Sequence, residues 1–318
     1  MSENLNNSIF CVFFGCCSNL YFLEKLIIID PGSGNLITFL QFLFIALEGL
    51  IFTMKFFTRQ RKIPLKDYII LVIMFFITSL CNNYVFDLNI PIPLHIIFRS
   101  GSLITNLIMG IFILKKNYNI IKYISVIMIT IGIFICTLMS GLQIEEKHHH
   151  HHHHHIESQY SIHFWWIIGI GLLTLALLIT SRMGLYQEVL YKRYGKYPKE
   201  ALFYAHFLPL PFFGLIYNNI IQHFIICSNS IKILIPIINY SIPIAWLYLF
   251  GNILTQYICI RSVYILTSEC SSLTVTLIVT LRKFISLIIS IIYFKNLFTF
   301  YHGIGTTFVF FGTILFTE

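Results

Sequence analysis

Five basic residues occur inside long apolar stretches of the sequence: Arg99, Arg182, Arg261, Arg282 and Lys283. A charge at the centre of a membrane-spanning helix costs about 2.5–3.5 kcal/mol on insertion scales. Arg182 and Arg261 lie towards the ends of their stretches, where a long side chain can reach the membrane surface. Arg99 lies roughly 9 Å, and Arg282 and Lys283 roughly 18 Å, into theirs, at 1.5 Å per residue. We therefore expect these three cations to serve a function within the membrane.

Two interpretations of the buried cations are open. Glu24, Glu48 and Asp87 could neutralise them in an internal network of ion pairs, although none of the three is well placed to do so. Alternatively, the cations face a water-filled cavity and bind an anionic ligand. Arginine offers a planar fork to phosphate oxygens and lysine a compact charge, so the three groups suit a diphosphate. Ser102 follows Arg99 by three residues on the same helical face and can add a hydroxyl group.

Uncharged polar residues lie in neighbouring apolar stretches: Asn82, Asn83, Tyr84, His95, Asn252, Gln256 and Tyr257. Amides can pair with base edges or sugar hydroxyls, and a tyrosine ring can stack on a base. Interhelical hydrogen bonds, worth about 0.6 kcal/mol each on average, are the alternative for any single residue. Five of these residues are predicted to contact a nucleoside or sugar: Asn83, Tyr84, Asn252, Gln256 and Tyr257.

The chain that must position these residues is strongly apolar. Of its 318 residues 57% are hydrophobic and 11% charged, and the mean hydropathy is +0.80. A soluble domain has about 25% charged residues, and disorder needs low hydrophobicity, so both classes are excluded. A spanning helix needs about 20 apolar residues. Ten such stretches can be placed, at 8–29, 36–57, 67–88, 93–115, 120–140, 163–190, 201–226, 242–265, 270–294 and 301–317.

We thus predict an all-α polytopic membrane protein with ten transmembrane helices. Pro209 and Pro211 predict a kink in the seventh. No stretch shows the ten-residue alternation of a membrane barrel, so strands are not supported.

Basic residues gather in alternate connections between the ten stretches, which indicates the orientation of the chain. Twelve lie on one side: Lys55, Arg59, Arg61, Lys62, Lys66, Lys115, Lys116, Lys122, Lys192, Arg193, Lys196 and Lys199. The other side has only Lys25, Lys147, Lys232 and Lys295. The positive-inside rule therefore predicts that both termini are cytosolic. Nucleic-acid binding, the alternative for a net charge of +8, is excluded because the basic residues are scattered over short loops.

One long connection divides the chain. We predict a first five-helix repeat at 1–140, a luminal linker at 141–162 and a second five-helix repeat at 163–318. The linker holds eight consecutive histidines, His148 to His155. A metal site, a native low-complexity tract and an inserted tag are all open for this tract, and we expect no specific metal role.

A weak internal similarity supports the two halves. Lys115 and Gly132 are separated by 17 residues, as are Lys295 and Gly312, and an offset of 180 residues relates the two pairs. An offset of five spans inverts the second copy in the membrane. Inverted repeats of this kind occur in many transporters, with the substrate site between the halves near the middle of the bilayer.

Signatures of other site chemistry are absent from the sequence. The eight cysteines show no CxxC pair and no zinc-type spacing, and we expect them to be small apolar side chains in helices rather than a disulfide framework. The sequence has no HExxH, GxSxG or P-loop motif and no paired acids within the membrane. We therefore expect no catalytic residue, no cofactor and no metal. A membrane-embedded transferase would need a catalytic acid or a metal site.

Several segments resemble one known family. They are GCCSN (15–19), GNLITFLQFLFIALEG (34–49), PLHIIFRSGSL (93–103), KEALFY (199–204), NILTQYICIR (252–261) and SLTVTLIVTLRKF (272–284). These segments resemble nucleotide-sugar transporters of the drug/metabolite transporter superfamily, from about residue 9 to the end of the chain. Leu297, in place of the family's usual proline, and the histidine tract depart from the pattern, but neither touches the predicted site.

The resemblance implies ten helices in two inverted five-helix repeats, in a Golgi or endoplasmic reticulum membrane. It implies exchange of cytosolic UDP-N-acetylglucosamine, UDP-xylose or both for luminal UMP. In related transporters, basic residues of spans four and nine hold the phosphates, which here implies Arg99, Arg282 and Lys283. A carrier of the same fold for another nucleotide or phosphorylated metabolite is the alternative, and a homodimer is an open alternative to a monomer.

Overall fold

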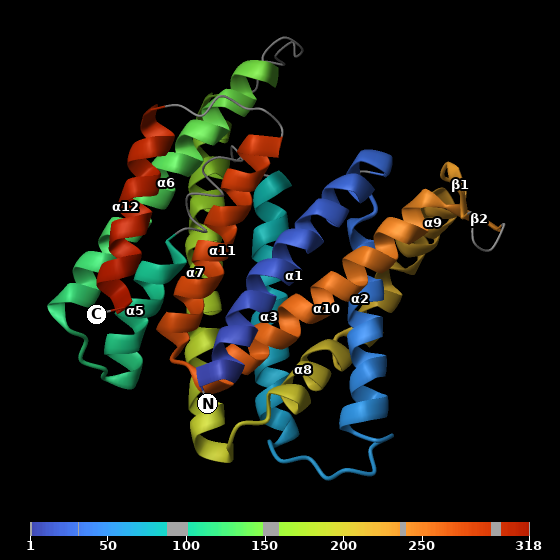
Figure 1. Ribbon diagram of the computed structural model, residues 1–318, viewed down its shortest axis with the longest axis horizontal. Coiled ribbons are helices and arrows are strands. Elements are labelled where there is room, and N and C mark those ends of the chain that lie inside the picture. The colour runs from blue at the N-terminus through green and yellow to red at the C-terminus, as the bar shows by residue number, and fades with distance from the viewer. Residues whose placement is uncertain are drawn as a thin grey trace. The chain divides into compact units, whose positions relative to one another are not determined.

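The computed structural model describes residues 2–30, 32–87, 101–148, 159–235, 240–293 and 300–317. It is mainly helical (Figure 1). The first part of the chain contains α1 (Ser2–Ile29), α2 (Gly34–Glu48) with a π-helical continuation η1 (Gly49–Thr53), α3 (Leu65–Asp87), α5 (Ser102–Leu114) and α6 (Ile120–His148). The second contains α7 (Gln159–Tyr194), α8 (Pro198–Phe207), the 3-10 segment η2 (Leu210–Ile216), α9 (Tyr217–Ser228), α10 (Ile244–Glu269), α11 (Ser272–Tyr293) and α12 (Phe300–Thr317).

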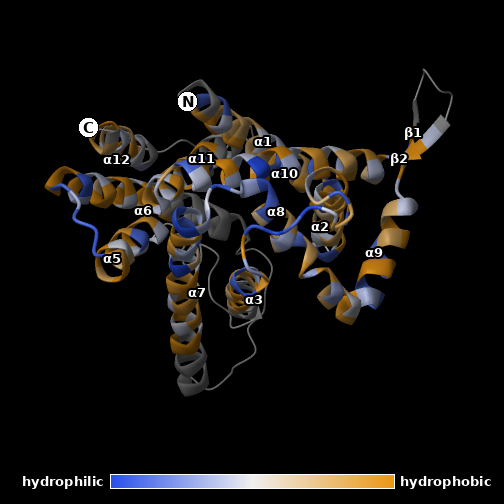
Figure 2. Ribbon diagram, turned by 90° about the horizontal axis from the view of Figure 1, so that it is seen from below, coloured by the Kyte–Doolittle hydropathy of each residue, from blue (hydrophilic) through white to orange (hydrophobic). Residues whose placement is uncertain are grey.

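Each of the ten predicted apolar stretches carries helix in its described part. Within the described ranges, five helical segments are long and apolar enough to cross a membrane: Leu5–Ile29, Gly34–Thr53, Ile167–Tyr194, Pro198–Ser228 and Ile244–Glu269. Figure 2 shows hydrophobic residues along most helices and a hydrophilic loop between α5 and α6. Apolar side chains such as Phe112 and Leu215 are exposed on the described surface, as expected where lipid is the solvent. A mostly helical membrane protein is thus supported, and the inverted arrangement of ten spans stays a prediction.

The predicted kink in the seventh stretch is confirmed. Helix α8 ends at Phe207, and the chain passes through η2, which contains Pro211, before α9 begins. Proline cannot donate the backbone hydrogen bond that an uninterrupted α-helix requires.

The expectation that the chain contains no strands is wrong in one place. Strands β1 (Lys232–Ile235) and β2 (Tyr240–Pro243) form an antiparallel hairpin between α9 and α10, with Lys232 opposite Pro243. Four-residue strands are too short to give the alternation expected of a barrel strand, so this pattern had no signal in the sequence.

The chain forms two compact units, each of which combines segments from both predicted halves. Unit 1 comprises residues 1–72 and 188–271, and unit 2 comprises residues 73–187 and 272–318. Helices α3 and α7 each contribute to both units. The predicted repeats, with boundaries at 140 and 163, are halves of the sequence, whereas these units are defined by contacts in space. The repeats therefore stay a prediction. The histidine tract from 149 onwards lies outside the described residues.

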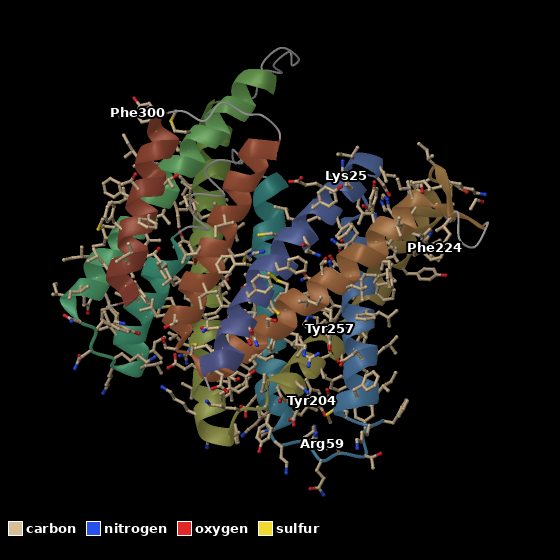
Figure 3. All side chains as sticks on the ribbon, in the orientation of Figure 1. Lys25, Arg59, Tyr204, Phe224, Tyr257 and Phe300 are labelled. Atoms are coloured by element: carbon tan, nitrogen blue, oxygen red, sulfur yellow. A yellow bond between two sulfur atoms is a disulfide. The ribbon has the colours of Figure 1, made fainter. Side chains whose placement is uncertain are left out.

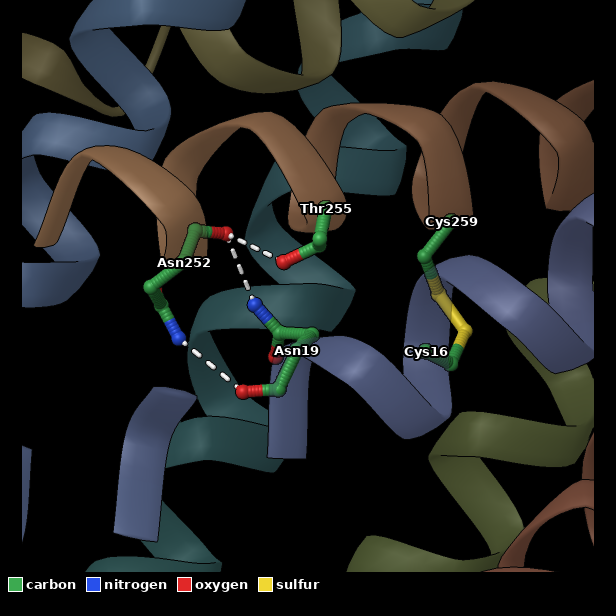
Figure 4. Close-up of a disulfide and its surroundings, with 5 residues drawn as sticks. All are labelled: Cys16, Asn19, Asn252, Thr255 and Cys259. Carbon is green, nitrogen blue, oxygen red and sulfur yellow. Dashed lines mark hydrogen bonds between the residues drawn. A yellow bond between two sulfur atoms is a disulfide. The ribbon is translucent and has the colours of Figure 1, made fainter. Parts of the chain in front are cut away.

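The antiparallel packing of α1 against α10 organises unit 1. A side chain at Gly15 would lie 2.9 Å from the backbone nitrogen of Cys259, so glycine permits this close approach. A disulfide joins Cys16 to Cys259, whose Cα atoms are 5.0 Å apart (Figure 4). The expectation that all cysteines are apolar fillers is therefore wrong for this pair. The two residues are 243 positions apart, and only the fold brings them together.

A buried carboxylate fixes the loop before α3 to α8. Glu200, which is 7% exposed, accepts hydrogen bonds from the backbone N–H groups of Lys62 and Ile63 and from the hydroxyl of Tyr68. These donor–acceptor distances are 3.0–3.1 Å. A buried carboxylate requires such compensation, so Glu200 has a structural role in the predicted cytosolic layer of unit 1.

In unit 2, α6 and α12 pack antiparallel in a close apolar interface. A side chain at Gly132 would lie close to the Gly305 carbonyl oxygen and 2.9 Å from Val309, and one at Gly312 would lie 2.8 Å from Ile129 and 3.0 Å from the Ser125 carbonyl oxygen. Gly305 and Val309 are the residues that correspond, at an offset of 180, to Ser125 and Ile129, so the two glycines make equivalent contacts. The packing is therefore reciprocal, as it is about a two-fold axis.

Candidate functional site

Of the predicted phosphate-binding side chains, the structure describes those of Arg282 and Ser102, which both lie in unit 2. Arg282 is half-buried near the middle of α11, and Ser102 is the first residue of α5. Lys283 follows Arg282 in α11, but its side chain lies outside the described part of the chain, as does the whole of Arg99.

The structure packs the two helices that carry these residues against each other. The amide nitrogen of Asn106 in α5 donates to the hydroxyls of Ser272 at 2.9 Å and Thr276 at 2.8 Å in α11. Leu103 and Leu107 join Leu277 and Phe284 in one apolar cluster. Ser102 lies one turn before Asn106, and Arg282 lies less than two turns after Thr276. The helices α5 and α11, which carry Ser102 and Arg282, are thus in contact, and the phosphate site itself stays a prediction.

The predicted nucleoside contacts lie on two helices. Asn83 and Tyr84 occupy the last turn of α3, where side chains are outside the described part of the chain. Asn252, Gln256 and Tyr257 lie on α10 in unit 1.

Asn252 is fully buried and engaged in helix packing. Its amide nitrogen donates to the Asn19 carbonyl oxygen at 3.2 Å, and the Asn19 amide donates to the Asn252 carbonyl oxygen at 2.8 Å (Figure 4). Gln41 of α2 donates to the Asn252 side-chain oxygen at 2.6 Å. The structure therefore supplies the interhelical role that the sequence left as the alternative for this residue.

Tyr257 and Arg261 form a polar pair in the second half of α10. The Arg261 guanidinium donates to the Tyr257 hydroxyl at 3.1 Å, and its central carbon lies 5.7 Å from the ring centroid. Phe44 of α2 packs edge-on against the same ring at 5.6 Å, and the Glu48 carboxylate interacts with the hydroxyl. Figure 3 labels Tyr257 on α10 and Arg59 in the exposed loop before α3.

A cavity of 890 Å³ opens beside this pair, where α1 begins and α10 ends. Leu5 and Ser8 of α1 line it together with Tyr257, Arg261 and Ser262 of α10. The sequence indicated only that Arg261 lies near a helix end. The spacing of four residues between Tyr257 and Arg261, which places both on one helical face, is the signal that could have suggested a shared site.

A pair of buried ionisable residues lies at the end of α1 that is far from this cavity. His223 Nδ1 lies 2.7 Å from Asp30 Oδ2, and the Gly32 backbone N–H donates to Asp30 Oδ1 at 3.2 Å. A side chain at Gly32 would collide with the imidazole ring, so glycine is required there. Among the described residues, no group of three or more His, Cys, Asp or Glu side chains could hold a metal ion.

Comparison with known sequences identifies the family. The profile of the UAA transporter family matches residues 5–318. The chain belongs to this family. The resemblance to nucleotide-sugar transporters noted in the sequence is therefore confirmed, and the members of the family are transporters rather than enzymes.

Two similar proteins match over nearly their whole length. The "Endoplasmic reticulum GDP-fucose transporter" of Drosophila melanogaster is 59% identical over 312 residues, which cover 96% of this chain and 88% of that protein. The "UDP-xylose and UDP-N-acetylglucosamine transporter" of Danio rerio is 54% identical over 307 residues, which cover 96% and 92%. A solved crystal structure with 12% identity matches 96% of this chain and 97% of its own at a TM-score of 0.62, and this likeness concerns the fold alone.

Proposed function

We propose that this protein carries UDP-N-acetylglucosamine, UDP-xylose or both from the cytosol into the lumen of the Golgi or endoplasmic reticulum in exchange for UMP. The observation that carries the proposal is the 54% identity, over nearly the whole of both chains, to the Danio rerio protein named for these two substrates. The cations that the sequence places inside apolar stretches give the physical basis, because nucleotide sugars are anionic.

An inverted-repeat transporter with ten spans and cytosolic termini is the architecture we propose for this exchange. The reciprocal packing of α6 against α12 supports the repeat, since Gly132 and Gly312 make equivalent contacts at an offset of 180 residues. Two inverted halves can rock about a shared site and expose it to each side of the membrane in turn.

In the proposed mechanism, the diphosphate is held by Arg99, Arg282, Lys283 and Ser102. The uridine and sugar contact Asn83, Tyr84, Gln256 and Tyr257, with Asn252 as a further candidate. Because an anionic ligand offsets the free energy of holding cations within the membrane, reorientation of the empty carrier is slow, and exchange with UMP is favoured.

The test is exchange in proteoliposomes preloaded with UMP. We expect uptake of labelled UDP-N-acetylglucosamine to fall about tenfold or more in Arg282→Ala and in Lys283→Ala, because each removes a charge-assisted hydrogen bond. The matched control is Arg182→Ala, which removes an exposed cation of α7, another helix with an apolar stretch. Exchange that is undiminished in both folded variants would reject the proposed site.

The nucleotide specificity needs a separate measurement, because the Drosophila relative is named for GDP-fucose. In wild-type proteoliposomes, unlabelled UDP-N-acetylglucosamine, UDP-xylose, GDP-fucose, CMP and adenine nucleotides would compete with the labelled substrate. Competition by the two UDP-sugars supports the proposal. Stronger competition by another nucleotide favours the alternative, a carrier of the same fold for a different nucleotide or phosphorylated metabolite.

A further inference from the structure

The 890 Å³ cavity of unit 1 shares Tyr257 with the proposed exchange site, but its cation, Arg261, has no part in that site. Its walls combine apolar and polar groups. Leu5, Ile258 and Ile265 supply apolar surface, whereas Ser8 and Ser262 supply hydroxyl groups. A cavity of this size and composition suits a small amphiphilic ligand.

The charge at this cavity favours an anion. Glu269 lines the cavity, but its carboxylate lies 2.6 Å from the ammonium group of Lys196, which neutralises it. Glu48 interacts with the Tyr257 hydroxyl and lines a smaller, separate pocket together with Tyr257 and Arg261. Arg261 lines the cavity, and no salt bridge joins it to an acid among the described residues. Its positive charge is therefore available to an anion.

The donors of Arg261 are mostly unused. A guanidinium carries five N–H donors in a planar fork. Among the described residues, the hydrogen bond of Arg261 is the one to the Tyr257 hydroxyl, which fixes the orientation of the fork on α10. A held guanidinium with spare donors is well suited to two phosphate oxygens.

We propose that this cavity is a second anion site, in which Arg261 binds the phosphate group of an amphiphilic phosphate ester. The apolar walls contact the rest of the ligand. Two sources share this chemistry: the headgroup of an anionic phospholipid and a nucleotide. The proposal shares Tyr257 with the exchange site but does not rest on exchange, because binding at Arg261 can be measured without transport.

The experiment measures the melting temperature of the purified full-length protein in detergent during ligand titration. The two anionic probes are short-chain phosphatidylinositol and UMP, and short-chain phosphatidylcholine is the neutral probe. Titrations are compared for wild type, Arg261→Gln, Arg261→Lys and Arg193→Gln. Arg193, an exposed cation of unit 1 outside the cavity, is the matched control.

We expect at least one anionic probe to stabilise wild type and Arg193→Gln, with about a tenfold higher half-maximal concentration in Arg261→Gln. Arg261→Lys should retain part of the response, since it keeps the charge and loses the fork. A response to phosphatidylinositol that is weakened in Arg261→Gln identifies a lipid. A weakened response to UMP, with complete loss only when Arg282→Gln is added, identifies a nucleotide that also binds the exchange site.

The proposal is overturned if neither anionic probe stabilises wild type, or if Arg261→Gln responds to both at wild-type concentrations. Should Arg261→Gln fail to fold, Cys11→Phe fills the cavity from α1 and leaves the charge in place, and it should weaken the same response. If Arg261 binds no phosphate, the exchange that depends on Arg282 is still expected. If Arg282→Ala loses exchange, its response to phosphatidylinositol should remain that of wild type. The two proposals therefore fail separately.

Discussion

The α1–α10 pair of unit 1 and the α6–α12 pair of unit 2 are the two most extensive helix contacts in the described chain, and they are built differently. Both use glycine to bring the backbones close together. The α1–α10 pair adds directional bonds, namely the Cys16–Cys259 disulfide and the reciprocal amide bonds of Asn19 and Asn252. The α6–α12 pair packs apolar side chains and backbone with reciprocal contacts.

The difference follows from the solvent. In lipid, apolar side chains gain little from leaving their surroundings, so helices associate through close van der Waals packing and polar bonds. The α6–α12 pair associates through close van der Waals packing, and the α1–α10 pair adds polar bonds to such packing. Shape complementarity at an interface related by a two-fold axis needs small residues in both helices, whereas polar bonds can specify one particular partner.

The largest expected effect comes from filling the close approach in unit 2. Gly132→Leu should destabilise the protein by about 3 kcal/mol, because the added side chain meets the backbone of Gly305, which cannot move aside as a flexible side chain can. Gly312→Leu should be as harmful, since it meets the backbone of Ser125 in the equivalent contact. Thermal unfolding in detergent measures both.

Gly303→Leu, in the same helix as Gly312, is the matched control for these two variants. Among the described residues, no heavy atom outside the local helix backbone lies within 4 Å of a Cβ atom added there, so the melting temperature should be close to that of wild type. Unequal effects of Gly132→Leu and Gly312→Leu would contradict the reciprocity on which the inverted repeat rests.

A smaller effect is expected when the covalent link in unit 1 is removed. A disulfide typically contributes 2–4 kcal/mol by constraining the unfolded chain. A membrane already confines that chain, so Cys16→Ser should lower stability by about 2 kcal/mol. Cys17→Ser is the control, because Cys17 is next in the sequence and is not part of this disulfide. If reducing agent lowers the melting temperature of Cys16→Ser as much as that of wild type, the stabilisation does not come from the Cys16–Cys259 disulfide.

The sequence predicted the helices more fully than the bonds between them. Length and hydropathy suffice to place helices, because every backbone group within a lipid bilayer must be paired inside its own segment. The offset between Gly132 and Gly312 suggested a repeat, but it did not predict that the two glycines lie in one helix interface. Cys16 and Cys259 could not be paired in this way, since a single sequence carries no signal for contacts over 243 residues. The cavity at Arg261 depends on how α1 and α10 pack, which composition does not determine.

The smallest expected effect separates packing from ligand contact on α10. Asn252→Leu removes the acceptor of Gln41 and the donor to the Asn19 carbonyl oxygen, and at about 0.6 kcal/mol per bond the loss of stability should be about 1 kcal/mol. Gln256, one turn further along the same face and half-buried, has no such bond among the described residues. Gln256→Leu should therefore keep the melting temperature and reduce exchange of the labelled nucleotide sugar, whereas Asn252→Leu lowers the melting temperature. If Gln256→Leu is the less stable variant and exchanges normally, the polar bonds that distinguish the α1–α10 pair lie elsewhere on α10.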